Sequence, residues 1–171
     1  CVTLGTGIGG GAIVEGRLQR GARGLANALG HIPLPVSTQP CSCGLAGCFE
    51  AEAGKRGAAR IAARFESLEA WTAAVRANDP GAMDALREYA AVLAQGLVSA
   101  IHLLDPEVLV LSGGIAIAGP NLVSALEQEL ARRVLVYSLR RMSIRLSAAG
   151  QYAGVRGAAA MARLMIRAAR K

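Results

Sequence analysis

Aromatic residues are scarce in this chain of 171 residues, at 4 % of the sequence. Lysine is scarce as well, because seventeen of the nineteen basic residues are arginines, and these are spread along the whole sequence. A groove for single-stranded nucleic acid combines basic residues with stacking rings, and no basic run here is interleaved with such rings. The formal net charge of +7 is therefore interpreted as solvated basic surface rather than as a nucleic-acid groove.

Long apolar runs are missing. The longest, residues 90–104, is interrupted by Gln95, Ser99 and His102 and falls short of the roughly 20 apolar residues that a membrane helix needs. We therefore expect no membrane association. No secretory leader is visible, and clustered thiols favour a reducing, cytoplasmic location. The sequence opens on Cys1 and runs at once into a predicted strand, so we expect it to be the second part of a longer polypeptide.

Three of the four cysteines, Cys41, Cys43 and Cys48, fall within eight residues in the order C-x-C-x4-C, and His31 lies ten residues upstream. Three thiolates and one imidazole are the ligand set of a closed, structural zinc site. The competing interpretation is a set of reduced cysteines buried in a turn, but this Gly- and Ser-rich loop offers little core to pack into. A disulfide is disfavoured, because Cys41 and Cys43 are too close for good geometry and one cysteine would be left over.

The opening of the chain predicts three short strands, at 2–4, 12–14 and 17–20, in a three-strand meander. Residues 5–11, glycines broken by Thr6 and Ile8, are predicted as a turn that can bring backbone N–H groups close to an anion. A Gly-rich hairpin without any ligand has the same pattern.

Beyond the cysteine loop, helical periodicity starts at Phe49, with Glu50 in the first turn beside the metal loop. Further helices are predicted at about 67–78, from Pro80 to about 104, and from Pro120. Strands are predicted at 107–111 and 143–147, and the first of these leads into Ser112, Gly113 and Gly114, where parallel sheets bind ligands. Residues 150–157 are predicted as a turn before a final Ala-rich helix that ends near residue 169.

This element order, three strands, helices, and then β-α-β-α, is that of a ribonuclease H-like domain of the actin and hexokinase superfamily. We therefore expect an α/β fold, β-β-β-α-β-α-β-α, with a zinc loop inserted at 31–48. Residues 1–150 would form the domain, and residues 151–171 would form a C-terminal helix. One copy of the unit is expected, because no internal repeat appears.

Several segments resemble the ROK family of repressors, open reading frames and kinases, which includes bacterial glucokinases. They are GTGIGGG (5–11), GH (30–31), CSCGLAGCFE (41–50), DPEVLVLSGG (105–114) and AGVRGAAA (153–160). The resemblance covers nearly the whole chain and corresponds to the second half of ROK proteins. The cysteine loop is its most specific part.

The resemblance implies a hexose ligand, ATP with Mg²⁺, and a structural Zn²⁺. His31 would bind zinc through one ring nitrogen and offer the other to a sugar hydroxyl, and Glu50 would lie close to the sugar. Thr6 would donate its hydroxyl to the ATP phosphates, and residues 112–114 would lie on the adenosine side. The implied nucleotide-binding residues are Gly5, Thr6, Gly7, Gly9, Gly10, Ser112, Gly113 and Gly114.

Two departures from the family pattern bear on function. Ala28 stands where the family usually has the Glu of Glu-x-Gly-His, and losing one hydrogen-bond partner in a polar site costs about 1 to 3 kcal/mol. The family's first phosphate-binding turn and catalytic Asp lie in the half that would precede Cys1. No catalytic residue is therefore predicted in this chain.

The resemblance leaves three functions open. The first is the C-terminal part of a glucokinase-like sugar kinase, inactive without the N-terminal half. The second is the sugar-sensing part of a ROK transcriptional repressor, which would bind DNA only through an upstream helix-turn-helix. The third is a pseudoenzyme domain kept for dimerisation. A homodimer is expected, and residues 151–171 would pack on the preceding half through Val155, Ala159, Leu164 and Met165.

Overall fold

The computed structural model describes residues 1–35 and 37–169, and its centre is a four-stranded sheet in the order β2-β1-β5-β6. The strands are Val2–Leu4 (β1), Ile8–Gly10 (β2), Val108–Ser112 (β5) and Ser143–Leu146 (β6). β1 pairs antiparallel with β2 and parallel with β5, and β5 pairs parallel with β6. The predicted α/β class is confirmed.

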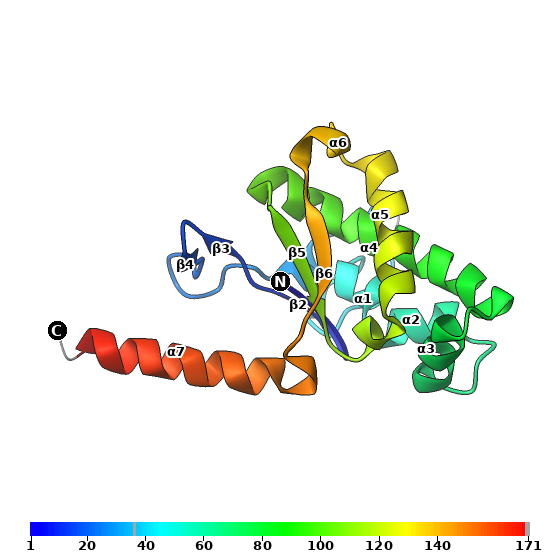
Figure 1. Ribbon diagram of the computed structural model, residues 1–171, viewed down its shortest axis with the longest axis horizontal. Helices are drawn as coiled ribbons and strands as arrows, with labels where there is room; N and C mark the ends of the chain where they lie inside the picture. Colours follow the sequence, from blue (N-terminus) through cyan, green and yellow to red (C-terminus); the bar gives the residue numbers. More distant parts are fainter. Residues whose placement is uncertain (36, 170–171) are drawn as a thin grey trace.

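Two long helices, α4 (Pro80–Leu104) and α5 (Pro120–Arg133), pack together and cover one face of this sheet (Figure 1). α4 begins where predicted, because the Asp79 side chain accepts a hydrogen bond from the N–H of Ala82 and Pro80 occupies the first turn. The shorter helices are α1 (Phe49–Ala53), α2 (Lys55–Ile61), α3 (Leu68–Arg76) and α6 (Tyr137–Arg140), with 3₁₀ turns at Leu29–His31 (η1), Ile115–Ala118 (η2) and Gly150–Tyr152 (η3).

Three fully buried aromatic side chains, Phe49, Trp71 and Tyr89, lie in α1, α3 and α4. The rings of Trp71 and Tyr89 lie edge to face with centroids 5.6 Å apart. Tyr89 donates its hydroxyl to the carbonyl of Ala53 at 2.8 Å, and the indole N–H of Trp71 donates to the carbonyl of Ala82 at 3.2 Å. These buried polar atoms are paired, so the rings fix the relative positions of the three helices.

The predicted three-strand meander is wrong in its arrangement. Ile13–Val14 (β3) and Arg17–Leu18 (β4) pair with each other in a separate two-stranded sheet, here called the β3–β4 ribbon. The predicted turn at 5–11 is also too long, because residues 8–10 pair with β1 as β2. The turn itself is confined to Gly5, Thr6 and Gly7.

The predicted turn at 150–157 is wrong as well, because helix α7 (Ala153–Ala169) starts after one 3₁₀ turn. α7 projects away from the body of the molecule (Figure 1). Its apolar side chains are exposed, Val155 at 70 %, Leu164 at 59 % and Met165 at 58 %. Residues 170–171 of the predicted helix lie outside the described residues. Among the described helices, none combines the length and apolar character of a membrane span.

An alanine substitution at Gly96 can test the packing of α1 against α4. A Cβ at Gly96 would lie 2.3 Å from the fully buried ring of Phe49, so we expect Gly96→Ala to lower the free energy of unfolding by about 1 to 3 kcal/mol. Gly157→Ala is the control, because a Cβ there meets no atom within 4 Å and alanine favours helix. Urea titration measures both variants. A gain in stability from Gly96→Ala would contradict this packing.

Candidate functional site

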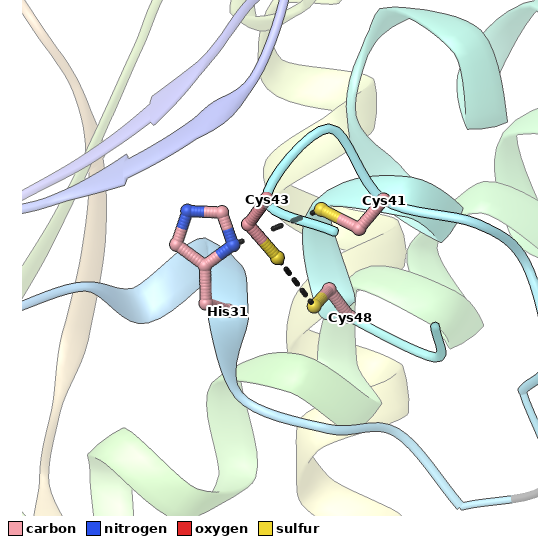
Figure 2. A group of neighbouring side chains, drawn as sticks. All are labelled: His31, Cys41, Cys43 and Cys48. Atoms are coloured by element: carbon pink, nitrogen blue, oxygen red, sulfur yellow. Dashed lines mark hydrogen bonds between the residues drawn. The ribbon is translucent and has the colours of Figure 1, made fainter. Parts of the chain in front are cut away.

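Four side chains with metal-binding atoms converge beside α1, and they are the four that the sequence predicts. The ligand atoms of His31, Cys41, Cys43 and Cys48 all lie within 4.8 Å of one another (Figure 2). His31 Nδ1 is 3.7 Å from Cys41 Sγ, and the sulfurs of Cys43 and Cys48 are also 3.7 Å apart. Tetrahedral zinc with bonds of about 2.3 Å places neighbouring sulfurs about 3.8 Å apart. The cluster can therefore hold a metal such as zinc.

The loop that carries the cysteines is shaped by backbone hydrogen bonds and by two glycines. The N–H of Cys41 donates to the carbonyl of Leu45 at 2.8 Å, which closes the loop. Gly44 and Gly47 have φ of 90° and 79°, a region that favours glycine. A Cβ at Gly47 would also lie 2.6 Å from the carbonyl oxygen of Ser37. The two glycines let the chain turn tightly enough to bring the three thiols together.

The thiols differ in acidity. A hydrogen bond from the backbone N–H of Cys43 is the main reason that the pKa of Cys41 is lowered to about 7. Burial is the main reason that the pKa of Cys48 is raised to about 12. Metals bind the thiolate form, so a bound metal must displace the proton of Cys48. Zinc affinity in such a cluster is coupled to proton release.

Glu50 connects the cysteine loop to the turn after β1. Its Oε2 accepts a hydrogen bond from the N–H of Ile8 at 3.0 Å, and its Oε1 accepts one from the Ser42 hydroxyl at 3.3 Å. The predicted position of Glu50, in the first turn of α1 beside the metal loop, is confirmed. Gly7 makes this contact possible, because a Cβ there would lie 2.1 Å from Glu50 Oε2.

A pocket of about 500 Å³ opens beside the same turn, where β1 and β5 end. Gly5, Thr6 and Gly114 line it, together with Lys55, Arg76 and the acidic residue Glu69. The carboxyl edge of parallel strands is where open α/β sheets bind ligands. The two cations outnumber the single carboxylate, which favours an anionic ligand.

The other predicted nucleotide residues do not line this pocket. Gly9 and Gly10 belong to β2, where Gly10 lies opposite Val2 at the start of β1, away from the pocket. Ser112 is buried at the end of β5. Gly113 has φ of 96°, and a Cβ there would lie 2.3 Å from the carbonyl oxygen of Leu4. Gly113 therefore allows the ends of β5 and β1 to approach.

Sequence reasoning missed the two cations. The N–H of Lys55 donates to the carbonyl of Gly5 at 2.8 Å, and Arg76 Nη1 donates to the carbonyl of Ile117 at 3.1 Å. One available signal was that lysine is rare here, with Lys55 one of only two. The approach of α3 to the turn after β5 is tertiary and has no local sequence signature.

Comparison with protein families matches residues 1–164 to the ROK family. The chain belongs to the ROK family. Glucokinase from Halalkalibacterium halodurans is 31 % identical over an alignment of 175 positions. The alignment covers 91 % of this chain and 53 % of the relative. This ROK chain thus spans about half the length of the curated relatives it matches.

Solved ROK structures agree with the fold. A ROK family glucokinase from Streptomyces griseus, in complex with glucose and AMPPNP, has a TM-score of 0.85 at 29 % identity. The match covers 96 % of this chain and 60 % of the glucokinase chain. A ROK family transcriptional regulator homologous to the E. coli MLC protein has a TM-score of 0.73 at 26 % identity. The match covers 85 % of this chain and 40 % of the regulator chain. This chain is therefore similar to both kinases and regulators.

We expect the purified protein to contain stoichiometric zinc by elemental analysis. Cys43→Ser and Cys48→Ser should lose the metal and lower the Tm, because each removes a thiolate ligand. Cys1→Ser is the matched control, since this fourth cysteine is exposed and outside the cluster. A zinc-free protein whose Tm is unaffected by a chelator would rule out the metal site.

Alanine substitutions at Gly7 and Gly5 can test the hydrogen bond between Glu50 and the N–H of Ile8. We expect Gly7→Ala to displace the Glu50 carboxylate from the N–H of Ile8, with a loss of about 1 kcal/mol of stability and a shift of the Ile8 amide resonance. A Cβ at Gly5 meets no atom within 4 Å, so Gly5→Ala should leave that resonance in place. Equal effects of the two changes would contradict the contact.

Proposed function

We propose that this chain is the second half of a ROK sugar kinase that transfers the γ-phosphoryl group of ATP to a hexose. The observation that carries the proposal is the pocket between Gly5 and Gly114, lined by two cations and one carboxylate, which Glu50 connects to the metal loop through the turn after β1. In the reaction a hexose hydroxyl oxygen bonds to the γ-phosphorus while the bond to the bridging oxygen of ADP breaks. The hydroxyl proton passes to a base on the preceding half.

For the nucleotide, we assign the phosphates to the turn of Gly5, Thr6 and Gly7, with the Thr6 hydroxyl as a donor. Lys55 and Arg76 line the same pocket and supply positive charge. Residues 112–114 take the adenosine side, since a Cβ at Gly114 meets no atom within 4 Å and a nucleotide can lie against its backbone. Bound Mg²⁺ would neutralise charge on the phosphates.

For the sugar, we assign His31 and Glu50. Figure 2 shows one ring nitrogen of His31 directed toward the sulfurs and the other directed away from them. A metal held by His31 and the three cysteines would have no open position and would serve a structural role. His31 would then present its second ring nitrogen to a sugar hydroxyl. Glu50 already accepts hydrogen bonds from Ile8 and Ser42, and a sugar hydroxyl would share Oε1 with Ser42.

The sheet order β2-β1-β5-β6 supports a ribonuclease H-like domain at 1–150. The helix at 151–171 would pack on the preceding half, which would cover the exposed side chains of Val155, Leu164 and Met165. We further propose a homodimer in the cytoplasm.

The repressor remains the second candidate because of Ala28. This residue precedes η1 and makes no side-chain cap, so it supplies no acceptor where ROK kinases usually have Glu. A site that senses a sugar without phosphorylating it tolerates weaker binding. The similarity to a ROK regulator is consistent with this alternative.

A coupled assay with ATP and a panel of hexoses tests the proposal. We expect no turnover by the 171-residue chain alone, because the base lies on the other half, and turnover once the preceding half is present. Phosphorylation by the chain alone would refute this division of the site. Hexose binding without turnover in the longer protein, together with DNA binding, would favour the repressor.

A further inference from the structure

Helix α1 carries two glutamates that contact different parts of the metal loop (residues 31–48). Glu50 accepts a hydrogen bond from Ser42, which follows Cys41, whereas Glu52 accepts one from Ser37, which precedes it. Residues two positions apart on a helix do not face each other, so the two carboxylates hold the loop from two directions. The hexose site proposed above uses Glu50 and leaves Glu52 without a role.

The hydrogen bond between Ser37 and Glu52 is short and charge-assisted. Ser37 Oγ donates to Glu52 Oε1 at 2.6 Å, within the range of about 2.5 to 2.7 Å for hydroxyl–carboxylate bonds. The Glu52 side chain is only 23 % exposed, so water competes for its carboxylate less than at an open surface. Ser37 Oγ also accepts a hydrogen bond from the N–H of Gln39 at 3.4 Å. One hydroxyl thus connects α1 to the segment that leads to Cys41.

Arg60 holds the other oxygen of the Glu52 carboxylate. Its Nη2 donates to Glu52 Oε2 at 2.7 Å and to the carbonyl of Ala51 at 3.0 Å. Gly57 lets α2 approach closely enough for this contact, because a Cβ there would overlap the carbonyl oxygen of Glu52. An ion pair near the surface adds little stability by itself. Here it fixes the orientation in which the carboxylate meets Ser37.

The position of Ser37 is coupled to the metal-binding cysteines through the backbone. Residues 39–41 and 45–47 form two antiparallel arms, in which the N–H of Gly47 donates to the carbonyl of Gln39 at 2.9 Å and an antiparallel bridge follows. The first arm ends at one metal-binding cysteine, and the second leads directly to another. A contact that fixes Ser37 therefore limits the movement of both thiols.

We propose that Glu52 is a positioning residue of the hexose site. Through Ser37 it holds the metal loop in the geometry that binds the ion, and the bound ion fixes His31 toward the sugar, while Arg60 orients the carboxylate. The hydrogen bonds of the Glu52 side chain go to Ser37 and Arg60, so it acts through the loop and not on the metal or the hexose. The effect on the sugar rests on the proposed function, whereas the effect on the metal rests on the cluster alone.

Three substitutions in the 171-residue chain separate the contact from the charge. Ser37→Ala and Glu52→Ala remove the hydrogen bond from its two ends. Glu52→Gln removes the charge but keeps a hydrogen bond to Ser37, because a hydroxyl can donate or accept and the amide offers both groups. Glu88→Ala, at an exposed position of α4, is the matched control.

We expect Ser37→Ala and Glu52→Ala each to weaken Zn²⁺ binding about tenfold, the lower end of the range for residues that support metal ligands, in competition with a chelator. In the protein as purified, both should speed hydrogen exchange at the Gly47 amide by about tenfold or more and leave the amides of α4 nearly unchanged, because only the loop is released. Glu52→Gln and Glu88→Ala should stay close to the original protein in both measurements.

Exchange that speeds up alike at Gly47 and throughout α4 would show that Glu52 supports only overall stability, and would overturn the proposal. Unchanged Zn²⁺ affinity and Gly47 exchange in Glu52→Ala, or an equal loss in Glu52→Gln, would overturn it as well. The exchange measurement decides the matter even for a protein that holds no metal.

The sugar is tested separately, in the longer protein that includes the preceding half. We expect Glu52→Ala to raise the hexose KM about tenfold while kcat changes by less than about threefold, because a loosened loop weakens binding of substrate and transition state alike. An unchanged KM would contradict the role in the hexose site. A longer protein without kinase activity would refute the proposed function and leave the zinc and exchange results standing.

Discussion

The parallel pairing of β1 with β5 is the constraint on which the rest of the molecule depends. Because Val2 lies beside Leu111, the turn after β1 and the loop after β5 emerge at the same edge, and the pocket lined by Lys55 and Arg76 forms between them. The same pairing places the starts of both strands together at the far end, where an apolar groove is lined by Val2 and Leu109. Gly113 permits the close approach of the two strand ends.

The metal cluster acts on this sheet through Glu50. One carboxylate oxygen is held by the backbone of Ile8 and the other by Ser42, so the cysteine loop and the turn after β1 share a single side chain. Charge-assisted hydrogen bonds of this kind are among the stronger ones in proteins. A metal that fixes the loop would thereby also fix the direction of the turn.

The sequence was sufficient for the parts of the fold that depend on local chemistry. Spacing predicted the convergence of His31 with the three cysteines, and the Asp79 cap with Pro80 predicted the start of α4. The arrangement of β3 and β4 was not predicted, because residues 12–14 satisfy strand propensity whether or not a neighbour completes their ladder. Lys55 and Arg76 were missed because only the packing of α2 and α3 brings them to Gly5 and Gly114.

The distance between position 7 and Glu50 also bears on how this family can vary. Any Cβ at position 7 would overlap the carboxylate, at 2.1 Å from Oε2, so the two positions are not independent during evolution. A lineage that acquires a side chain at position 7 must also shorten or redirect residue 50. Aligned relatives should therefore show correlated substitution at these two sites, although they are far apart along the chain.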